Sequence, residues 1–174
     1  MRRILILALA ATAAAGPAAA ETRYLAYDAA DRVTQALTKG VTLEADRGLF
    51  GATRVERLYS TAGEGSAALD RGGLSDGELR GALPAGATES NVYRIEPEGA
   101  GAALGRVLCP GAQEVFLVVG RVRPLRTLTM HAIGRGAAGT ALHCATLEYT
   151  YRGEWSQPDP RDVRGEGPVS PPRF

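Results

Sequence analysis

The chain is short of several residue types that mark specialised protein classes. Only two residues are Cys and one is Trp, and aromatic residues make up 6% of the sequence. After residue 20, no apolar run is long enough to cross a bilayer core as a helix, so no transmembrane segment is expected in the mature chain and a helical membrane channel is excluded. Glycine shows no three-residue period and no heptad repeat persists, which excludes collagen-like and coiled-coil proteins.

Length and overall composition describe an ordinary globular protein. Of the 174 residues, 45% are hydrophobic and 22% are charged, which argues against a wholly disordered chain. This length accommodates one domain of usual size with appendages, so a multidomain enzyme is excluded.

Lysine is almost absent, since Lys39 is the only lysine among the 20 basic residues. If Arg2 and Arg3 are removed with a leader, 18 basic residues remain against 19 acidic ones, a formal charge of −1. Proteins that bind nucleic acids usually carry a clear basic excess, because their basic side chains release counterions from phosphates. No nucleic acid is therefore expected as a partner.

Residues 1–20 have the three parts of a secretory signal peptide. Two arginines form a basic start, the run from Ile4 to Ala13 is apolar, and Ala18 and Ala20 supply the small side chains that signal peptidase requires. A retained membrane anchor is disfavoured, because about ten apolar residues are too few to span a bilayer core. We expect cleavage after residue 20 and a periplasmic or secreted mature protein.

The two cysteines, Cys109 and Cys144, are predicted to form one disulfide in an oxidising compartment. Closing a loop of this length would stabilise the fold by about 4 kcal/mol before any native strain is subtracted. A reactive thiol activated by the neighbouring His143 is the rival interpretation. It is weaker, because adjacent residues on a strand point to opposite faces.

Hydrophobic periodicity predicts one α+β domain over residues 21–155, with an antiparallel sheet of five or six strands and two helices on one face. The alternative is an all-β barrel with peripheral helices. Residues 156–174 hold half of the ten prolines and are expected to form a disordered tail. The expected strands are 41–45, 53–60, 91–96, 114–122, 126–133 and 140–152, and the apolar run 115–119 predicts that the fourth is buried on both faces. The expected helices are 29–38, capped by Asp28, and 100–108. A short helix is expected near 75–83, where Ser75 and Glu78 have the spacing of a capping box.

Residues 134–139 match the GxGxxG pattern of dinucleotide-binding loops. A strand pattern follows them where a phosphate-binding loop needs a helix, so a hairpin turn is predicted and no cofactor is expected. The same hairpin, paired about residue 137, would place His131 and His143 opposite each other. Two imidazoles are too few for a zinc site, and no metal is expected.

Two groups of residues are candidates for binding. Arg121, Arg123 and Arg126 lie near Pro124, where strand alternation would put the first two on one face and favour an anion. Tyr149, Tyr151 and Trp155 form the second group, a possible surface strip for stacking on sugars. Solvated turn charges and closure of a small core are the plainer interpretations of the two groups.

The sequence contains no SxxK motif, and isolated Ser, His and Asp residues occur in almost any chain, so no catalytic residue is assigned. We therefore expect an exported, non-catalytic binding or interaction module for an envelope protein, a glycan or an anionic surface. A small secreted hydrolase that uses carboxylates or His143 is the first alternative. A subunit of an extracellular assembly is the second.

Overall fold

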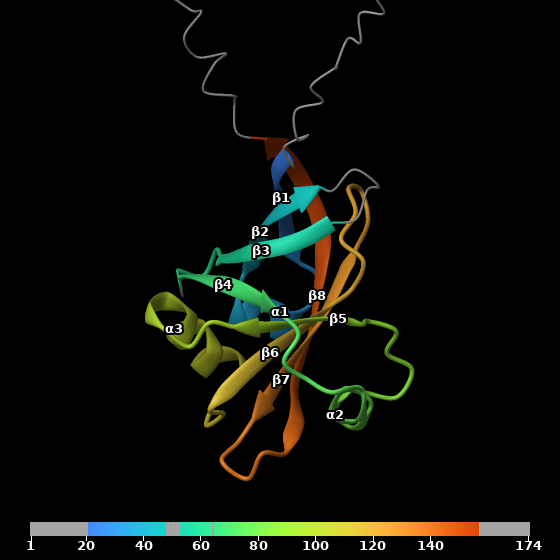
Figure 1. Ribbon diagram of the computed structural model, residues 1–174. Coiled ribbons are helices and arrows are strands. Elements are labelled where there is room, and N and C mark those ends of the chain that lie inside the picture. The colour runs from blue at the N-terminus through green and yellow to red at the C-terminus, as the bar shows by residue number, and fades with distance from the viewer. Residues whose placement is uncertain (1–20, 48–52, 64, 157–174) are drawn as a thin grey trace, which may run out of the picture.

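Eight antiparallel strands close into a barrel in the computed structural model, which describes residues 21–47, 53–63 and 65–156 (Figure 1). Each strand pairs with its neighbours in the sequence, and β1 also pairs with β8, which closes the barrel. The strands are β1 Glu21–Ala29, β2 Gly40–Arg47, β3 Thr53–Ser60, β4 Ser66–Arg71, β5 Asn91–Ile95, β6 Glu114–Val119, β7 Leu128–Arg135 and β8 Ala141–Ser156. Within these described ranges, no helix has the length and hydropathy needed to cross a membrane.

The predicted open α+β sheet is wrong, and the alternative, an all-β barrel with peripheral helices, describes the fold. The six predicted strands correspond to β2, β3, β5, β6, β7 and β8. The two that were not predicted, β1 and β4, complete the circle: β1 bridges β2 and β8, and β4 bridges β3 and β5. Without them the sheet has two open gaps, which is why an open sheet was expected.

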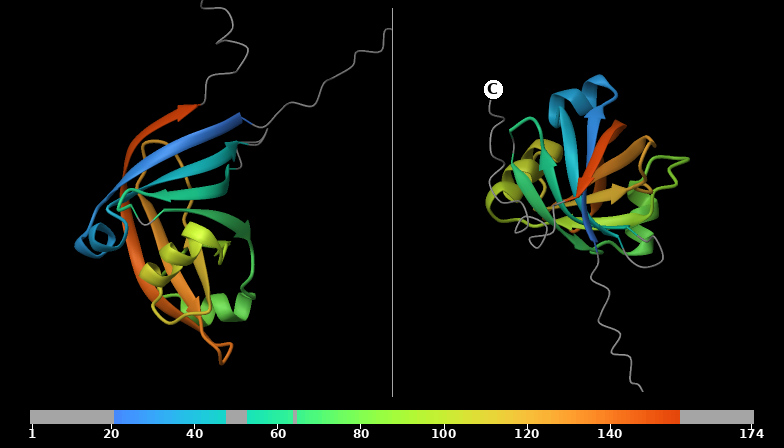
Figure 2. Two further views of the ribbon diagram at one scale, coloured as in Figure 1. Left: turned by 90° about the vertical axis from the view of Figure 1, so that its left-hand side faces the viewer. Right: turned by 90° about the horizontal axis from the view of Figure 1, so that it is seen from above.

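Three short helices pack against the barrel (Figure 2), and the last of them contributes Leu104 and Leu108 to the core inside it. They are α1 Arg32–Leu37, α2 Asp76–Ala82 and α3 Gly99–Leu108. The first was expected to begin at Ala29 behind Asp28; instead β1 continues to Ala29, and the Asp31 carboxylate accepts the amides that begin α1. The predicted capping box of α2 is confirmed between Ser75 and Glu78.

The core has two parts, one inside the barrel and one between α2 and the wall. The run over β6, predicted as a strand buried on both faces, serves both parts. Leu117 and Val119 belong to the inner core, and Phe116 and Val118 to the outer one. Arg135 ties α2 to this wall, because its guanidinium reaches Glu78 at 2.7 Å and Glu114 at 2.8 Å.

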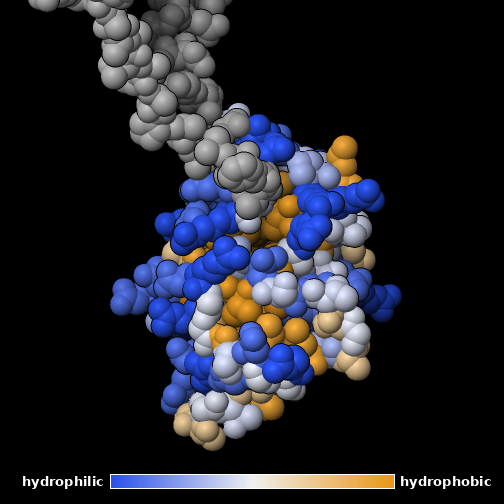
Figure 3. Space-filling model, turned by 45° about the vertical axis from the view of Figure 1, so that its right-hand side comes forward, coloured by the Kyte–Doolittle hydropathy of each residue, from blue (hydrophilic) through white to orange (hydrophobic). Residues whose placement is uncertain are grey.

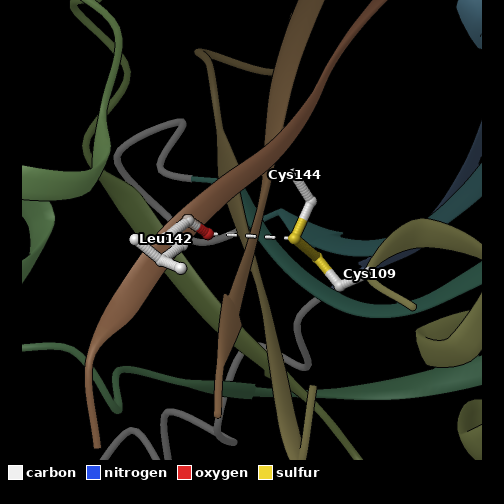
Figure 4. Close-up of a disulfide and its surroundings, with 3 residues drawn as sticks. All are labelled: Cys109, Leu142 and Cys144. Carbon is white, nitrogen blue, oxygen red and sulfur yellow. Dashed lines mark hydrogen bonds between the residues drawn. A yellow bond between two sulfur atoms is a disulfide. The ribbon is translucent and has the colours of Figure 1, made fainter. Parts of the chain in front are cut away.

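The predicted disulfide between Cys109 and Cys144 is confirmed, with a Cα–Cα distance of 5.4 Å (Figure 4). Cys109 caps the C-terminus of α3, and Cys144 is the extra residue of a bulge in β8, since Ala132 pairs with Ala145 and Ile133 with His143. The Leu142 carbonyl oxygen lies 3.8 Å from the Cys144 sulfur. This is a packing contact, because a disulfide sulfur carries no proton to donate.

The hairpin between β7 and β8 is also confirmed, and residues 134–139 form the end of β7 and its turn. The Gly139 amide donates to the Gly136 carbonyl at 3.0 Å across this turn. The GxGxxG pattern therefore reflects turn geometry here.

Candidate functional site

A cavity of about 320 Å³ opens at the end of the barrel where β1 begins and β8 ends. Figure 3 shows hydrophilic side chains, with apolar ones between them, at this end of the molecule. We call this cavity the barrel mouth. It is lined by Arg23, Leu25, Ala45, Arg47, Thr53, Val122, Arg123, Pro124, Arg126 and Glu154.

Strand alternation explains why arginines gather at the barrel mouth. Leu25 and Ala45 are buried in the inner core. Arg23 lies two residues before Leu25 and Arg47 two residues after Ala45, so both arginines share the inner face and lie nearer the rim. The connection between β6 and β7 supplies Arg123 and Arg126, and Val122, directly before Arg123, is buried in the barrel core. Four arginines from three separate segments therefore line one small cavity.

The charge of the barrel mouth is strongly unbalanced. Glu154 supplies the one carboxylate among the described residues that line it. That carboxylate is already engaged, because Arg23 Nη1 lies 2.7 Å from its Oε1 and the side chain is only 15% exposed. Arg47, Arg123 and Arg126 therefore leave an excess of positive charge facing the cavity.

A buried tyrosine ties the β6–β7 connection to the barrel. Tyr27 is 1% exposed, and its hydroxyl donates to the Arg123 carbonyl oxygen at 3.3 Å. Burial, together with the nearby Tyr151 and Glu154, raises the pKa of Tyr27 to about 12. The hydroxyl stays protonated at physiological pH, so this bond holds the backbone that carries Arg123.

The three arginines singled out in the sequence are only partly brought together. Arg123 and Arg126 line the barrel mouth, whereas Arg121 is exposed and outside the lining. The strand alternation used to group Arg121 with Arg123 does not apply, since β6 ends at Val119 and a loop follows. Arg23 and Arg47 were missed, because only closure of the barrel brings them to the same rim.

The predicted aromatic strip is split between two faces of the wall. Tyr149 is buried inside the barrel and Tyr151 packs against the same core. Arg152 is the extra residue of a second bulge in β8, because Ala26 pairs with Gly153 and Tyr27 with Tyr151. The bulge reverses the alternation, so Trp155 lies outside, where its ring stacks on Tyr24 at 6.1 Å between centroids.

Both histidines belong to a hydrogen-bonded chain on the outside of the barrel. His131 Nε2 lies 3.1 Å from the Glu89 carboxylate and Nδ1 lies 3.1 Å from the Thr146 hydroxyl. His143 Nε2 lies 3.2 Å from that same hydroxyl. The predicted pairing of the two histidines is wrong, because His131 pairs with Thr146 and His143 with Ile133.

The hydrogen bonds of this histidine chain can all be made at once. His143 donates to the Thr146 oxygen, Thr146 donates to His131 Nδ1, and His131 Nε2 donates to Glu89. Burial lowers the pKa of His143, and the adjacent His131 lowers it further. In the part of the chain that the structure describes, no group of three or more His, Cys, Asp or Glu side chains is arranged to hold a metal ion.

The Glu89 contact predicts a pH-dependent contribution to stability. Burial raises the pKa of Glu89, but hydrogen bonds from its own amide, from His131 and from the Thr88 amide outweigh burial and lower it below 4.5. We expect Glu89→Gln to reduce the free energy of unfolding by about 1 kcal/mol at neutral pH. A carboxyl with a lowered folded pKa stabilises above its unfolded pKa, so the difference from wild type should disappear as the pH falls below 4.5.

Urea unfolding of both proteins between pH 7 and pH 3 measures this difference. Parallel stability curves over the whole range would show that ionisation of the Glu89 carboxyl contributes nothing to the stability of the fold.

Comparison of the chain with protein-family models, with curated proteins and with solved structures finds no match. The binding properties of the barrel therefore have to be inferred from its own residues.

Proposed function

We propose that the protein is an exported, non-catalytic binding module that takes a small anionic molecule at the barrel mouth. The observation that carries the proposal is the convergence of Arg23, Arg47, Arg123 and Arg126 on one cavity of about 320 Å³. That volume lies in the range of small-molecule sites. Eight-stranded barrels are wide enough for at most one small ligand, and here the inner core fills the barrel below the mouth.

The chemistry of the rim favours carboxylate or phosphate oxygens. Each guanidinium offers several N–H donors in a planar fork that matches two oxygens of one anionic group. The floor of the cavity, with Leu25, Ala45 and Val122, is apolar and buried. A bound anion would therefore be partly removed from water. Charge-assisted hydrogen bonds are stronger in such a site than at an open surface.

Two observations support export of the protein. The first is the signal-peptide pattern of residues 1–20, which lie outside the described residues. The second is the disulfide between Cys109 and Cys144, since such crosslinks persist mainly in oxidising compartments. A periplasmic or secreted location agrees with both.

The hydrolase alternative would need substrate beside His143, the exposed end of the histidine chain. Its hydroxyl partner Thr146 is already bonded to both imidazoles, and His131 is 4% exposed. These groups are satisfied by one another. The arginines of the barrel mouth, by contrast, face a cavity, so binding is the better-supported function.

Isothermal titration calorimetry of the mature protein tests the proposal, with citrate as the carboxylate probe and inorganic pyrophosphate as the phosphate probe. We expect saturable binding of one of the two. Arg123→Gln and Arg126→Gln should each weaken it at least tenfold, because a hydrogen bond to a charged group contributes about 1.5–3 kcal/mol.

Arg121→Gln is the matched control. It removes the same charge from the same loop but lies outside the cavity lining, so its affinity should stay within twofold of wild type. No saturable binding of either probe, or equal losses in all three variants, would overturn the proposed function.

A further inference from the structure

A second hollow, of about 330 Å³, crosses the outer face of the barrel over β8, β1 and β2. It is separate from the barrel mouth and independent of its proposed function. We call it the outer trough. It is lined by Ala26, Tyr27, Val41, Thr42, Thr61, Arg152, Gly153 and Trp155.

The register of the three strands explains the shape of the outer trough. One cross-strand row joins Trp155 to Tyr24. The next row, two residues along, joins Gly153 to Ala26 and Ala26 to Thr42. Because side chains two residues apart share a face, a row of small side chains lies beside a row of large aromatic ones. The small row is the floor of the trough and the aromatic row is one wall.

Trp155 is held as an exposed, fixed platform. Its side chain is 50% exposed although it is large and apolar. The ring is supported from behind by Tyr24, with an angle of 11° between the two planes. An aromatic ring whose orientation is fixed before binding loses little conformational entropy when a ligand stacks on it.

Polar groups border the floor of the trough. Arg152 lies 3.5 Å from the Asp28 carboxylate, and the two side chains are 67% and 58% exposed, so both remain accessible. The Thr61 hydroxyl donates to backbone carbonyls, with Gly40 O at 3.1 Å, which leaves its lone pairs free to accept. Thr42 adds a second hydroxyl to the lining.

We propose that the outer trough binds a pyranose unit of a glycan, with the apolar face of the sugar on Trp155 and its hydroxyls toward Arg152, Asp28 and the two threonines. A sugar ring has one apolar face and a polar circumference, which matches one aromatic wall and a polar border. The small floor residues Gly153 and Ala26 leave room for the ring. The charges bordering this hollow are balanced, because Arg152 is paired with Asp28. The hollow differs in this respect from the barrel mouth.

The chain offers a direct probe, since Trp155 is its only tryptophan. The mature protein is titrated with the tetramers of β-1,4-linked N-acetylglucosamine, β-1,4-linked glucose and α-1,4-linked glucose, and tryptophan emission is recorded. We expect a saturable change in emission with at least one tetramer. No saturable change with any of the three would overturn the proposal.

Gly153→Val tests the trough itself. A Cβ at Gly153 meets nothing within 4 Å, so a side chain there occupies the hollow without disturbing the fold. We expect this variant to bind the sugar at least tenfold more weakly. Gly136→Val is the control, because it also adds a side chain in open space but lies in the distant β7–β8 turn.

Trp155→Ala, followed by calorimetry, checks the aromatic wall independently and should also weaken binding at least tenfold. Thermal unfolding of each variant confirms that it is folded. Wild-type affinity in either Gly153→Val or Trp155→Ala would overturn the proposal, as would an equal loss in Gly136→Val.

Discussion

Replacing both Cys109 and Cys144 with Ser is expected to lower the free energy of unfolding by about 4 kcal/mol. The crosslink closes a loop between residues 35 positions apart and so restricts the unfolded chain. It also fastens the C-terminal end of α3 to the bulge in β8. Urea unfolding followed by circular dichroism measures the loss.

Reduction of the wild-type protein provides the control for this prediction. Treatment with a thiol reductant should lower the wild-type unfolding midpoint to that of the double Ser variant and leave the variant unchanged. Equal stability of the oxidised, reduced and Ser-substituted proteins would show that the disulfide does not support the barrel.

Gly101→Ala is expected to destabilise the protein by about 3 kcal/mol, at the upper end of the usual cost of overpacking. Gly101 lies in α3, where the helix approaches the backbone that leaves β5. A Cβ added there would lie 2.1 Å from the Glu96 carbonyl oxygen. Backbone cannot rotate away as a side chain can, so α3 must move off the wall. A lower thermal midpoint would report this displacement.

Gly81→Ala supplies a matched comparison in α2. A Cβ at Gly81 meets nothing within 4 Å, and Ala is a better helix former than Gly by about 1 kcal/mol. This variant should therefore be slightly more stable than wild type. If Gly101→Ala were stabilising to the same degree, the close approach of α3 to Glu96 would be contradicted.

The local elements of this chain are readable from its sequence wherever one pattern continues without interruption. The apolar run over β6 and the spacing of Ser75 and Glu78 both predict what is found. The missed strands carry weaker patterns. Asp28 resembles a helix cap at the end of β1, and β4 (Ser66–Arg71) is short and opens with Ser and Ala, which resemble loop composition.

Two bulges in β8 explain most of the remaining errors. The extra residues Cys144 and Arg152 each reverse which side of the wall the following side chains face. A strict period of two along β8 would place His143 on the same face as Ala145, and Trp155 on the same face as Tyr149. A bulge arises from the fit of one strand to its neighbour, so the pattern of a single strand does not contain it.

The barrel mouth was only half predictable for a related reason. Arg123 and Arg126 are close in sequence, so their shared location followed from proximity. Arg23 and Arg47 reach the same rim because β1 pairs with β2 and closes against β8. Their contribution depends on a long-range topology that local periodicity does not encode.

Arginine side-chain NMR tests the central claim most directly. The Nε–Hε signals of the mature protein are assigned and followed during titration with citrate and with pyrophosphate at constant ionic strength. The barrel-mouth account predicts saturable shifts at Arg23, Arg47, Arg123 and Arg126 with one of these anions, and no such shifts at Arg80 in α2 or Arg106 in α3. Uniform, non-saturating shifts across all of these arginines, or no shifts at all, would contradict it.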